Sequence, residues 1–380
     1  MPKRKPGSSR AARGGAPIVL LILALLVLIG VLSRWTPGSI PASTAPPDTN
    51  PAQTEDSALP QEDSPWYSLY FTRPGGPESS ALLGGPDEAL AAAIAGARLS
   101  VDMAAYDIDL YRIRDALLDA HRRGLSVRVV TDSDYLDEDA VQTIQEEGIP
   151  LLGDRREGSM HNKFVVIDRQ EVWTGSMNFT VNDAYRNDNN LIRLRSLQLS
   201  QDYTVEFEEM FEGDLFGSKT LAGTLYPAVD VDGTPVEIFF SPDDGTARRL
   251  VELLLSAQKS ICFLAYSFTS DELADAVIER AKAGVAVAGV MEESQVNSNQ
   301  GSEYTRFRKA GLDVRLDGNP RNMHHKVLIV DGQIVVTGSY NFSSNAEKMN
   351  DENTLIIHNA GISGQYLDEF ERIFEEAKSK

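Results

Sequence analysis

From Trp66 onward, the hydrophobic and polar positions follow two alternating periods. Short apolar runs typical of buried strands are separated by stretches in which apolar residues recur every three or four positions, as on one face of a helix. In the first half, this pattern predicts helices over 87–97, 110–123 and 138–147, strands over 99–106, 125–131, 161–167, 171–176 and 189–194, and a closing helix that ends at Phe211. Alternating strands and helices are typical of an α/β fold with a central sheet.

The same pattern recurs in the second half, from Glu237 to Ala377, at a nearly constant spacing. Ala105-Tyr106 corresponds to Ala265-Tyr266, 160 positions later. After a short insertion the spacing becomes 163, and it then holds for Gly148 and Gly311, His161 and His324, Gly175-Ser176 and Gly338-Ser339, Asn187 and Asn350, and Phe207 and Phe370. A constant offset over so many positions indicates an internal duplication.

The duplication predicts two α/β halves, which we place at 66–220 and 221–380. Residues 213–235 are rich in Gly, Pro and Asp and read as the connector between the repeated patterns.

The amino-terminal segment has a different pattern. Residues 14–33 contain no charged side chain, and 18–32 form a nearly unbroken apolar run. This run is at the short end for a membrane-spanning helix, so a cleaved signal peptide competes with a retained anchor. No small-x-small cleavage site follows closely, since the nearest is Ser43-x-Ala45. We therefore expect one transmembrane signal anchor over 17–34.

The flanks of this anchor predict its orientation. Residues 1–16 are basic and are expected to stay in the cytoplasm, which makes the chain a single-pass membrane protein with its carboxyl-terminal bulk outside the cytoplasm. Residues 35–65 are rich in Pro, Ser, Thr and Ala without apolar periodicity, and we expect a disordered linker there.

Charge and cysteine content narrow the function classes. The chain has 36 basic and 56 acidic side chains; six basic ones lie in the first 35 residues, which leaves 30 against 56, or −26, for the rest. A surface this acidic repels polyanions and anionic membranes at long range, so the basic footprint of a general nucleic-acid binder is missing. The single cysteine, Cys262, excludes a disulfide framework and a thiolate metal site within one chain.

Two segments carry the same pattern of His, Lys and Asp. The pattern is made by His161, Lys163 and Asp168 in the first half and by His324, Lys326 and Asp331 in the second. On a predicted strand, side chains two positions apart point to the same face. An ammonium can neutralise phosphoryl oxygens there while an imidazole attacks or donates a proton, so this pairing suits phosphoryl chemistry.

Each segment is followed by a Gly-Ser-x-Asn turn, which supplies four candidate phosphate-binding residues: Ser176, Asn178, Ser339 and Asn341. Taken alone, one His-x-Lys is usually a solvated strand face and one Gly-Ser-x-Asn is usually a turn. Both motifs occur together and recur at one offset, and three of the five histidines fall within these segments. The combination therefore favours a functional site.

These residues resemble the phospholipase D superfamily, whose hallmark is a duplicated HxK(x)4D motif followed by Gly-Ser-x-Asn. The resemblance covers 66–380, and residues 324–353 are similar to the branch of small bacterial endonucleases and mitochondrial cardiolipin hydrolases. In that branch two single-motif chains usually pair. Here both motifs lie in one chain, so no partner chain is needed to complete the site.

The resemblance implies two halves related by a pseudo-twofold axis, with both motifs meeting at their interface and with no metal or other cofactor. One histidine forms a covalent phosphohistidine, and the other protonates the leaving alcohol and then activates water. The resemblance further implies that Lys163 and Lys326 hold the phosphate with help from Asn178 and Asn341. Asp168 and Asp331 are expected to orient and charge-balance the interface.

One asymmetry concerns the residue expected to orient each histidine ring. The resemblance implies a carboxylate at a fixed distance after each motif histidine; the second half has Glu352 at this place, whereas the first half has Asn189. A carboxylate favours the protonated imidazole, and an amide orients the ring without adding charge. We therefore expect His324 to be the acid and His161 the nucleophile.

The motifs leave the substrate open between a phospholipid and a nucleic acid. A membrane anchor and an acidic surface favour a lipid, whereas the resemblance around His324 favours a nuclease. Several basic residues precede the motifs and could line a nucleic-acid groove, although each is more often a solvated surface residue: Arg155, Arg156, Arg306, Arg308, Lys309 and Arg321.

Two further alternatives are less favoured. A phosphatidyl transferase would use the same intermediate with an alcohol in place of water, but such enzymes generally carry two amino-terminal spans, and one is visible. An inactive phosphate-binding module predicts loss of a motif His or Lys, and all four are present.

Overall fold

The computed structural model describes residues 65–377 except residue 157. The expected basic flank and anchor, and the linker up to residue 64, lie outside the described residues. Within the described part, none of the helices combines the length and the apolar character that a membrane crossing requires.

The first half is built on a mixed sheet with the strand order β1-β7-β6-β5-β2-β3-β4. Strands β2, β3 and β4 run parallel, and the remaining neighbours are antiparallel. Its elements are β1 (Tyr67–Phe71), α2 (Pro77–Ser80), α3 (Pro86–Gly96), β2 (Ser100–Ala105), α4 (Tyr111–Arg122), β3 (Ser126–Thr131), α5 (Asp139–Glu146), β4 (Leu151–Gly153), β5 (Lys163–Ile167), β6 (Glu171–Gly175), α6 (Val181–Tyr185), β7 (Asn190–Arg195) and α7 (Leu197–Phe211).

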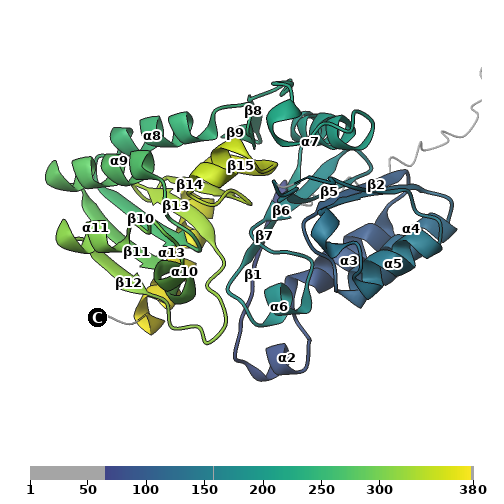
Figure 1. The fold of residues 1–380 in the computed structure, drawn as a ribbon, viewed down its shortest axis with the longest axis horizontal. Coiled ribbons are helices and arrows are strands. Elements are labelled where there is room, and N and C mark those ends of the chain that lie inside the picture. Colours follow the sequence, from purple (N-terminus) through teal and green to yellow (C-terminus); the bar gives the residue numbers. More distant parts are fainter. Residues whose placement is uncertain (1–64, 157, 378–380) are drawn as a thin grey trace, which may run out of the picture. The chain divides into compact units, whose positions relative to one another are not determined.

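The second half repeats this arrangement in a sheet with the order β12-β11-β10-β13-β14-β15-β9-β8. Its elements are β8 (Ala228–Val231), β9 (Thr234–Ser241), α8 (Thr246–Ser256), β10 (Ser260–Ala265), α9 (Asp271–Lys282), β11 (Ala286–Met291), α10 (Glu293–Ser298), α11 (Tyr304–Lys309), β12 (Asp313–Leu316), β13 (Lys326–Val330), β14 (Ile334–Gly338), α12 (Ser344–Lys348), β15 (Glu352–His358) and α13 (Ala360–Glu376). The two sheets lie on either side of the interface between the halves (Figure 1).

The α/β prediction is confirmed, and every element predicted for the first half is present with ends within two residues of the predicted ones. Two differences affect the motifs and the connector. Strands β5 and β13 begin at Lys163 and Lys326, so each motif histidine precedes its strand. Strand β8 lies inside the segment that was expected to be a connector.

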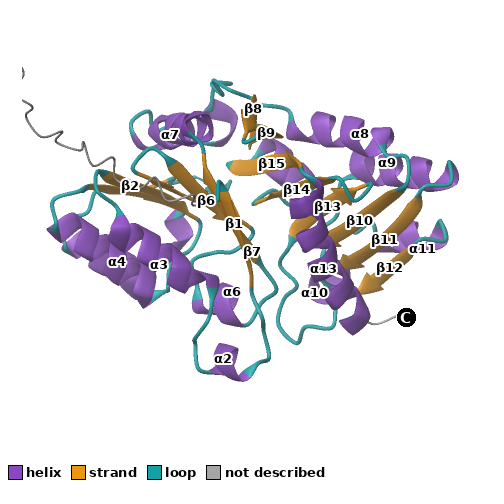
Figure 2. Cartoon of the chain, turned by 180° about the vertical axis from the view of Figure 1, so that it is seen from behind, coloured by secondary structure: helices purple, strands orange, loops and turns teal. Residues whose placement is uncertain are grey.

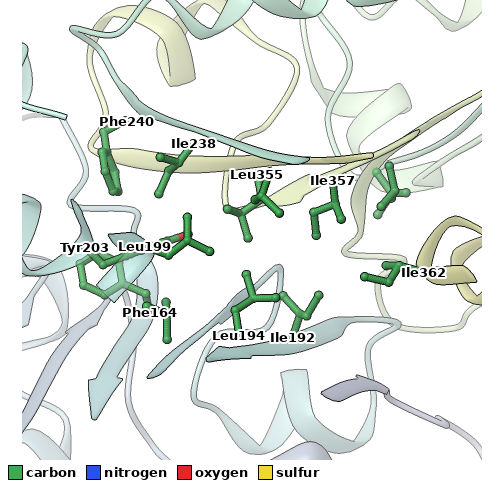
Figure 3. Packing of buried hydrophobic residues seen from close by; sticks show 14 of the residues in the cluster. Phe164, Ile192, Leu194, Leu199, Tyr203, Ile238, Phe240, Leu355, Ile357 and Ile362 are labelled. Carbon is green, nitrogen blue, oxygen red and sulfur yellow. The ribbon is translucent and has the colours of Figure 1, made fainter. Parts of the chain in front are cut away.

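Three hydrophobic clusters divide the described residues into layers. One cluster joins α3, α4 and α5 to the outer face of the first sheet, and a second joins α8, α9 and α11 to the outer face of the second. The third lies between the two inner faces and includes the long helices α7 and α13, which Figure 2 shows with the sheets on either side. In Figure 3, Ile192 and Leu194 of β7 lie opposite Leu355 of β15. The halves therefore share one continuous core.

Within this shared core, two equivalent asparagines are bonded across the interface. The Oδ1 atom of Asn190 accepts hydrogen bonds from Thr337 Oγ1 (2.8 Å) and Tyr366 Oη (3.1 Å) of the second half. The Oδ1 atom of Asn353 accepts from Thr174 Oγ1 (2.7 Å) and Tyr203 Oη (3.1 Å) of the first half. Buried hydroxyl groups need such partners, so the pair ties β7 to β14 and α13, and β15 to β6 and α7, across the interface.

Replacing Asn353 by Ala is expected to lower the free energy of unfolding by about 3 kcal/mol, because it leaves the buried hydroxyls of Thr174 and Tyr203 without their acceptor. Urea unfolding followed by tryptophan fluorescence measures the change. Asn345→Ala, at an exposed position on α12, is the matched control and should shift stability by less than about 0.5 kcal/mol. Equal effects of both substitutions would contradict this account of the interface.

Candidate active site

The two motif lysines lie at equivalent places on the two sheets. Lys163 opens β5 opposite Ala105, the last residue of β2, and Lys326 opens β13 opposite Ala265, the last residue of β10. Both lysine side chains are buried, and the two motif histidines are less than a tenth exposed. The motif residues therefore gather where the central parallel strands end, beside the interface between the halves.

Each histidine backbone is held by the other half. His161 N donates to Asp351 O (3.0 Å), and His324 N donates to Asp188 O (2.9 Å). Asp351 N and Asp188 N return bonds to Ser159 O (3.0 Å) and Asn322 O (2.9 Å) in the opposite half. These bonds make short parallel bridges between the halves and bring both motifs to one site.

The histidine rings follow the same crosswise rule, which reverses the expected pairing. His161 Nδ1 lies 2.8 Å from Glu352 Oε2, and His324 Nδ1 lies 3.1 Å from Asn189 Oδ1. The expectation that Glu352 orients His324 and that Asn189 orients His161 was wrong, because the loop before β7 and the loop before β15 each cross to the other half's histidine. The role assignment drawn from that pairing loses its original basis.

The lysines are fixed by equivalent contacts. Lys163 Nζ donates to His161 O (2.7 Å) and Lys326 Nζ donates to His324 O (2.8 Å). Each ammonium also lies over a tyrosine ring, Lys163 over Tyr106 and Lys326 over Tyr266.

Sequence reasoning missed Tyr106 and Tyr266 as site residues. Their rings meet the rings of His161 and His324 edge to face, with centroid distances of 4.9 and 4.5 Å. The signal was present in the internal repeat, where Ala105-Tyr106 matches Ala265-Tyr266. A polar aromatic residue kept at the end of both central strands marks the walls of the site.

Burial and mutual repulsion control the charges of the four motif side chains. Burial lowers the pKa of His161 to about 4, although Glu352 opposes this, and burial together with the neighbouring cations holds the pKa of His324 well below its usual value. Burial lowers the pKa of Lys163 to about 8 and that of Lys326 well below its usual range. An anionic group bound here would favour the protonated forms of all four, so the site is suited to an anion.

The Gly-Ser-x-Asn residues divide into two kinds. Ser176 Oγ donates to Asn189 Oδ1 (2.8 Å) and accepts from Asn190 N (3.1 Å), while Ser339 Oγ accepts from Asn353 N (3.0 Å), so both fully buried hydroxyls serve the following strand. By contrast, the buried Oδ1 atoms of Asn178 and Asn341 have no hydrogen-bond partner among the described residues. The asparagine side chains are the better candidates for contact with a ligand.

The motif aspartates lie away from the site. Asp168 accepts bonds from the backbone N–H groups of Arg98, Leu99 and Ser100, and Asp331 does so from 258–260, at the far ends of β5 and β13. Each aspartate lies five residue steps along an extended strand, about 17 Å, from its motif lysine. Both aspartates are structural, but the expected place at the interface was wrong, because they fix the start of β2 and β10.

A carboxylate that the motifs did not predict lies beside His324. Asp183 on α6 is buried, and its Oδ2 lies 3.5 Å from His324 Nδ1. Across the described residues, no group of three or more His, Cys, Asp or Glu side chains is arranged to hold a metal ion.

Comparison with known proteins identifies the family. The profile described as "Cardiolipin synthase, PLD-like domain" matches 90–211 and again 250–374. The mitochondrial cardiolipin hydrolase of Homo sapiens is 39% identical over 133 residues, which cover 35% of this chain and 52% of that protein. The chain thus spans about half the length of this relative.

Two solved structures are similar as well. Nuc from Salmonella typhimurium, a phospholipase D family member, is 32% identical and matches 39% of this chain and 98% of its own, with a TM-score of 0.37. Phosphatidylserine synthase from Haemophilus influenzae is 15% identical, with a TM-score of 0.61 over 82% of this chain and 87% of its own, and so shares the fold. The duplicated profile match covers most of the chain and coincides with the two halves, so this protein belongs to the phospholipase D-like family and carries its domain twice.

Proposed function

We propose that this protein is a membrane-anchored phosphodiesterase that hydrolyses phospholipids through a covalent phosphohistidine, without a metal ion. The observation that carries the proposal is the convergence of two buried His-Lys pairs, each held by backbone bonds from the opposite half. Two ammonium groups and two imidazoles around one position are suited to a single phosphodiester. The ammonium groups stabilise the negative charge on its oxygens, and the imidazoles transfer protons during its cleavage.

The observed ring partners support His161 as the nucleophile, for a reason other than the expected pairing. Glu352 accepts a hydrogen bond from the Nδ1–H group of His161. This keeps the ring proton on Nδ1 and leaves the Nε2 lone pair free to attack phosphorus. A new P–N bond forms as the P–O bond to the leaving alcohol breaks. The phosphorylated ring is cationic, and Glu352 at 2.8 Å balances that charge directly.

His324 then completes both steps. It donates a proton to the oxygen of the leaving alcohol, and in the second step it takes a proton from water, whose oxygen attacks phosphorus while the P–N bond breaks and His161 is restored. Lys163 and Lys326 stabilise the charge on the non-bridging oxygens, and the side-chain NH2 groups of Asn178 and Asn341 donate neutral hydrogen bonds to the same oxygens.

A loop that interrupts the internal symmetry supports a lipid substrate. Phe71 and Phe240 are equivalent, because they pair with the equivalent residues Asn190 and Asn353. Between Phe71 and α3 the first half has residues 72–85, where the second half has only 241–245 before α8. The first half therefore carries nine extra residues at this place.

The extra residues form a loop that is bonded to the segment before β7. Thr72 Oγ1 donates to Asn187 O (2.8 Å) and Ser79 Oγ donates to Tyr185 O (2.6 Å), which ties the loop to the segment that holds His324. Leu82 and Leu83, which precede two glycines, are 38% and 54% exposed. A groove of about 340 Å³ runs from this loop to the segment before the second motif, lined by Ser79, Leu82, Tyr185, Asp188, Asn319 and Arg321.

Exposed leucines on a loop tied to the segment that holds His324 are suited to the apolar boundary of a bilayer. Three of the six basic residues that could line a nucleic-acid groove are paired with carboxylates. Arg155 pairs with Asp214, and Arg156 pairs with Asp351, while Arg306 contacts three carboxylates at 271, 275 and 303. These pairings reduce the positive charge left for a nucleic acid and support phospholipid as the proposed substrate.

The first prediction concerns the reaction itself. The full-length protein in detergent micelles should release the headgroup or alcohol from phospholipids at the same rate with and without EDTA. His161→Ala should abolish turnover, and His324→Ala should lower kcat by roughly 10²- to 10⁴-fold, as expected for loss of a general acid. Loss of activity in EDTA would contradict the metal-free mechanism, and cleavage of single-stranded nucleic acid without phospholipid turnover would favour a nuclease.

A second prediction tests the loop. Leu82→Ser combined with Leu83→Ser should lower the rate on phospholipid vesicles by about 10- to 30-fold. The reason is that partial insertion of two exposed leucines into the bilayer contributes about 2 kcal/mol to membrane binding. The rate on a short-chain phospholipid below its micelle concentration should not change. Leu221→Ser with Leu225→Ser, two exposed leucines of the connector, is the control. Equal losses on both substrates would show that the loop does not act through a membrane.

A third prediction concerns topology. If residues 17–34 anchor the chain with a cytoplasmic amino terminus, alkaline phosphatase fused after Lys380 should be active, since it folds only outside the cytoplasm. A fused β-galactosidase, which works only in the cytoplasm, should be inactive. The opposite pair of results would reverse the orientation.

A further inference from the structure

The two histidines have unequal direct partners. Glu352 supplies a full negative charge to His161, whereas the amide of Asn189 supplies none to His324. Asp183 lies behind Asn189, with its Oδ2 3.5 Å from His324 Nδ1. Both rings therefore have a carboxylate near Nδ1, but the two carboxylates come from different places in the fold.

The internal repeat shows that each half has a carboxylate at a position where the other half has an uncharged residue. At the spacing of 163, Asn189 corresponds to Glu352 on β15, and Asp183 on α6 corresponds to Ala346 on α12. The equivalent residues Asn187 and Asn350 each bond the carboxylate of their own half. Asn187 Nδ2 donates to Asp183 Oδ1 (2.5 Å), and its counterpart Asn350 Nδ2 donates to Glu352 Oε1 (3.2 Å).

We propose that Asp183 is the positioning residue that supplies the counter-charge of His324, acting from α6 as Glu352 acts for His161 from β15. The inference rests on the proposed function, in which His324 is the general acid. The carboxylate near one histidine thus comes from a strand, whereas the carboxylate near the equivalent histidine comes from a helix.

The surrounding hydrogen bonds fix the geometry through which Asp183 acts. Ser176 Oγ accepts from the Asn190 backbone, so its own proton goes to Asn189 Oδ1, and Asn189 Nδ2 donates to Asp183 O (3.1 Å). The oxygen of Asn189 must then face His324, which places the ring proton on Nδ1 and leaves Nε2 toward the substrate.

Asp183 itself is held firmly. Its side chain is 4% exposed, Oδ2 accepts the N–H of Asn178 (2.8 Å), and its own N–H bonds the capping Thr180 Oγ1 (3.2 Å) at the start of α6. A buried carboxylate that accepts bonds from the Asn178 N–H and from Asn187 Nδ2 keeps its distance from the ring.

The other charged groups around His324 oppose its protonation. Lys326 on β13, Lys163 on β5, His161 and His325 all lower the pKa of His324, in addition to burial. Tyr266 packs edge-on against the ring and is neutral, and Glu352 is engaged with His161. Asp183 is the carboxylate within 4 Å of His324 in the described residues, so it favours the protonated state that a general acid needs.

The first test compares leaving groups. Asp183→Ala and Asp183→Asn should lower kcat at least 10-fold on substrates with an alkyl alcohol leaving group, whose departure needs a proton. The rate should change less than threefold on bis(p-nitrophenyl) phosphate, because p-nitrophenolate leaves without protonation. The alkaline limb of the kcat profile should also move to lower pH by about one unit, because removing a nearby negative charge lowers the pKa of His324. Asp119→Asn, an exposed carboxylate on α4, is the matched control.

The second test transplants the arrangement of the other half. Asp183→Ala combined with Asn189→Glu reproduces Ala346 and Glu352 and frees Asn187 to bond the new carboxylate as Asn350 does. This double variant should regain the alkyl-substrate rate to within about threefold and restore the alkaline limb. Such rescue cannot come from a role of Asp183 in folding alone.

The proposal is overturned if the single variants keep full activity on alkyl substrates, or if they lose both substrates equally and the double variant restores neither. Thermal unfolding of each variant separates a folding defect from a lost charge. Failure of the proposed function is recognised separately, because the wild type would then cleave neither substrate. In that case, imidazole NMR titration in inorganic phosphate decides the inference: Asp183→Ala must lower the pKa of His324 and the double variant must restore it.

Discussion

The site depends on four backbone hydrogen bonds that cross the interface between the halves. They join the segment that leads into each motif strand to the loop before the last strand of the opposite half. Because these bonds lie beside a continuous hydrophobic core, the halves cannot separate without dismantling both the core and the site. The buried lysines and histidines are thereby brought to one position. Burial lowers the pKa of both lysines there, and a bound anion would favour their protonated forms.

Much of this architecture could be predicted from the sequence. Apolar periodicity located the strands and helices because they are long and strongly patterned, and the constant offset between His161 and His324 revealed the duplication. Strand β4, with three residues, and helix α6, with five, carry too few periods to be detected. The loop with Leu82 was missed because Pro and Gly mark a loop without showing where it lies.

The partners of the site residues could not be predicted in the same way. The sequence contains Asn189 and Glu352 at matching positions, but it does not show that each loop crosses to the other half. Asp168 is close to Lys163 along the chain, yet the extended strand β5 places the two residues at its opposite ends. Distance along a strand and crossing of an interface are properties of the folded chain, and motif spacing contains neither.

The crosswise contacts also bear on how such a site can change. In an assembly of two identical chains, a substitution at the ring partner alters both histidines at once, and the two must remain chemically alike. With two copies in one chain, position 189 affects His324 alone and position 352 affects His161 alone. Two copies in one chain thus allow the two histidines to differ, and the residue that distinguishes each histidine lies in the half that does not contain it.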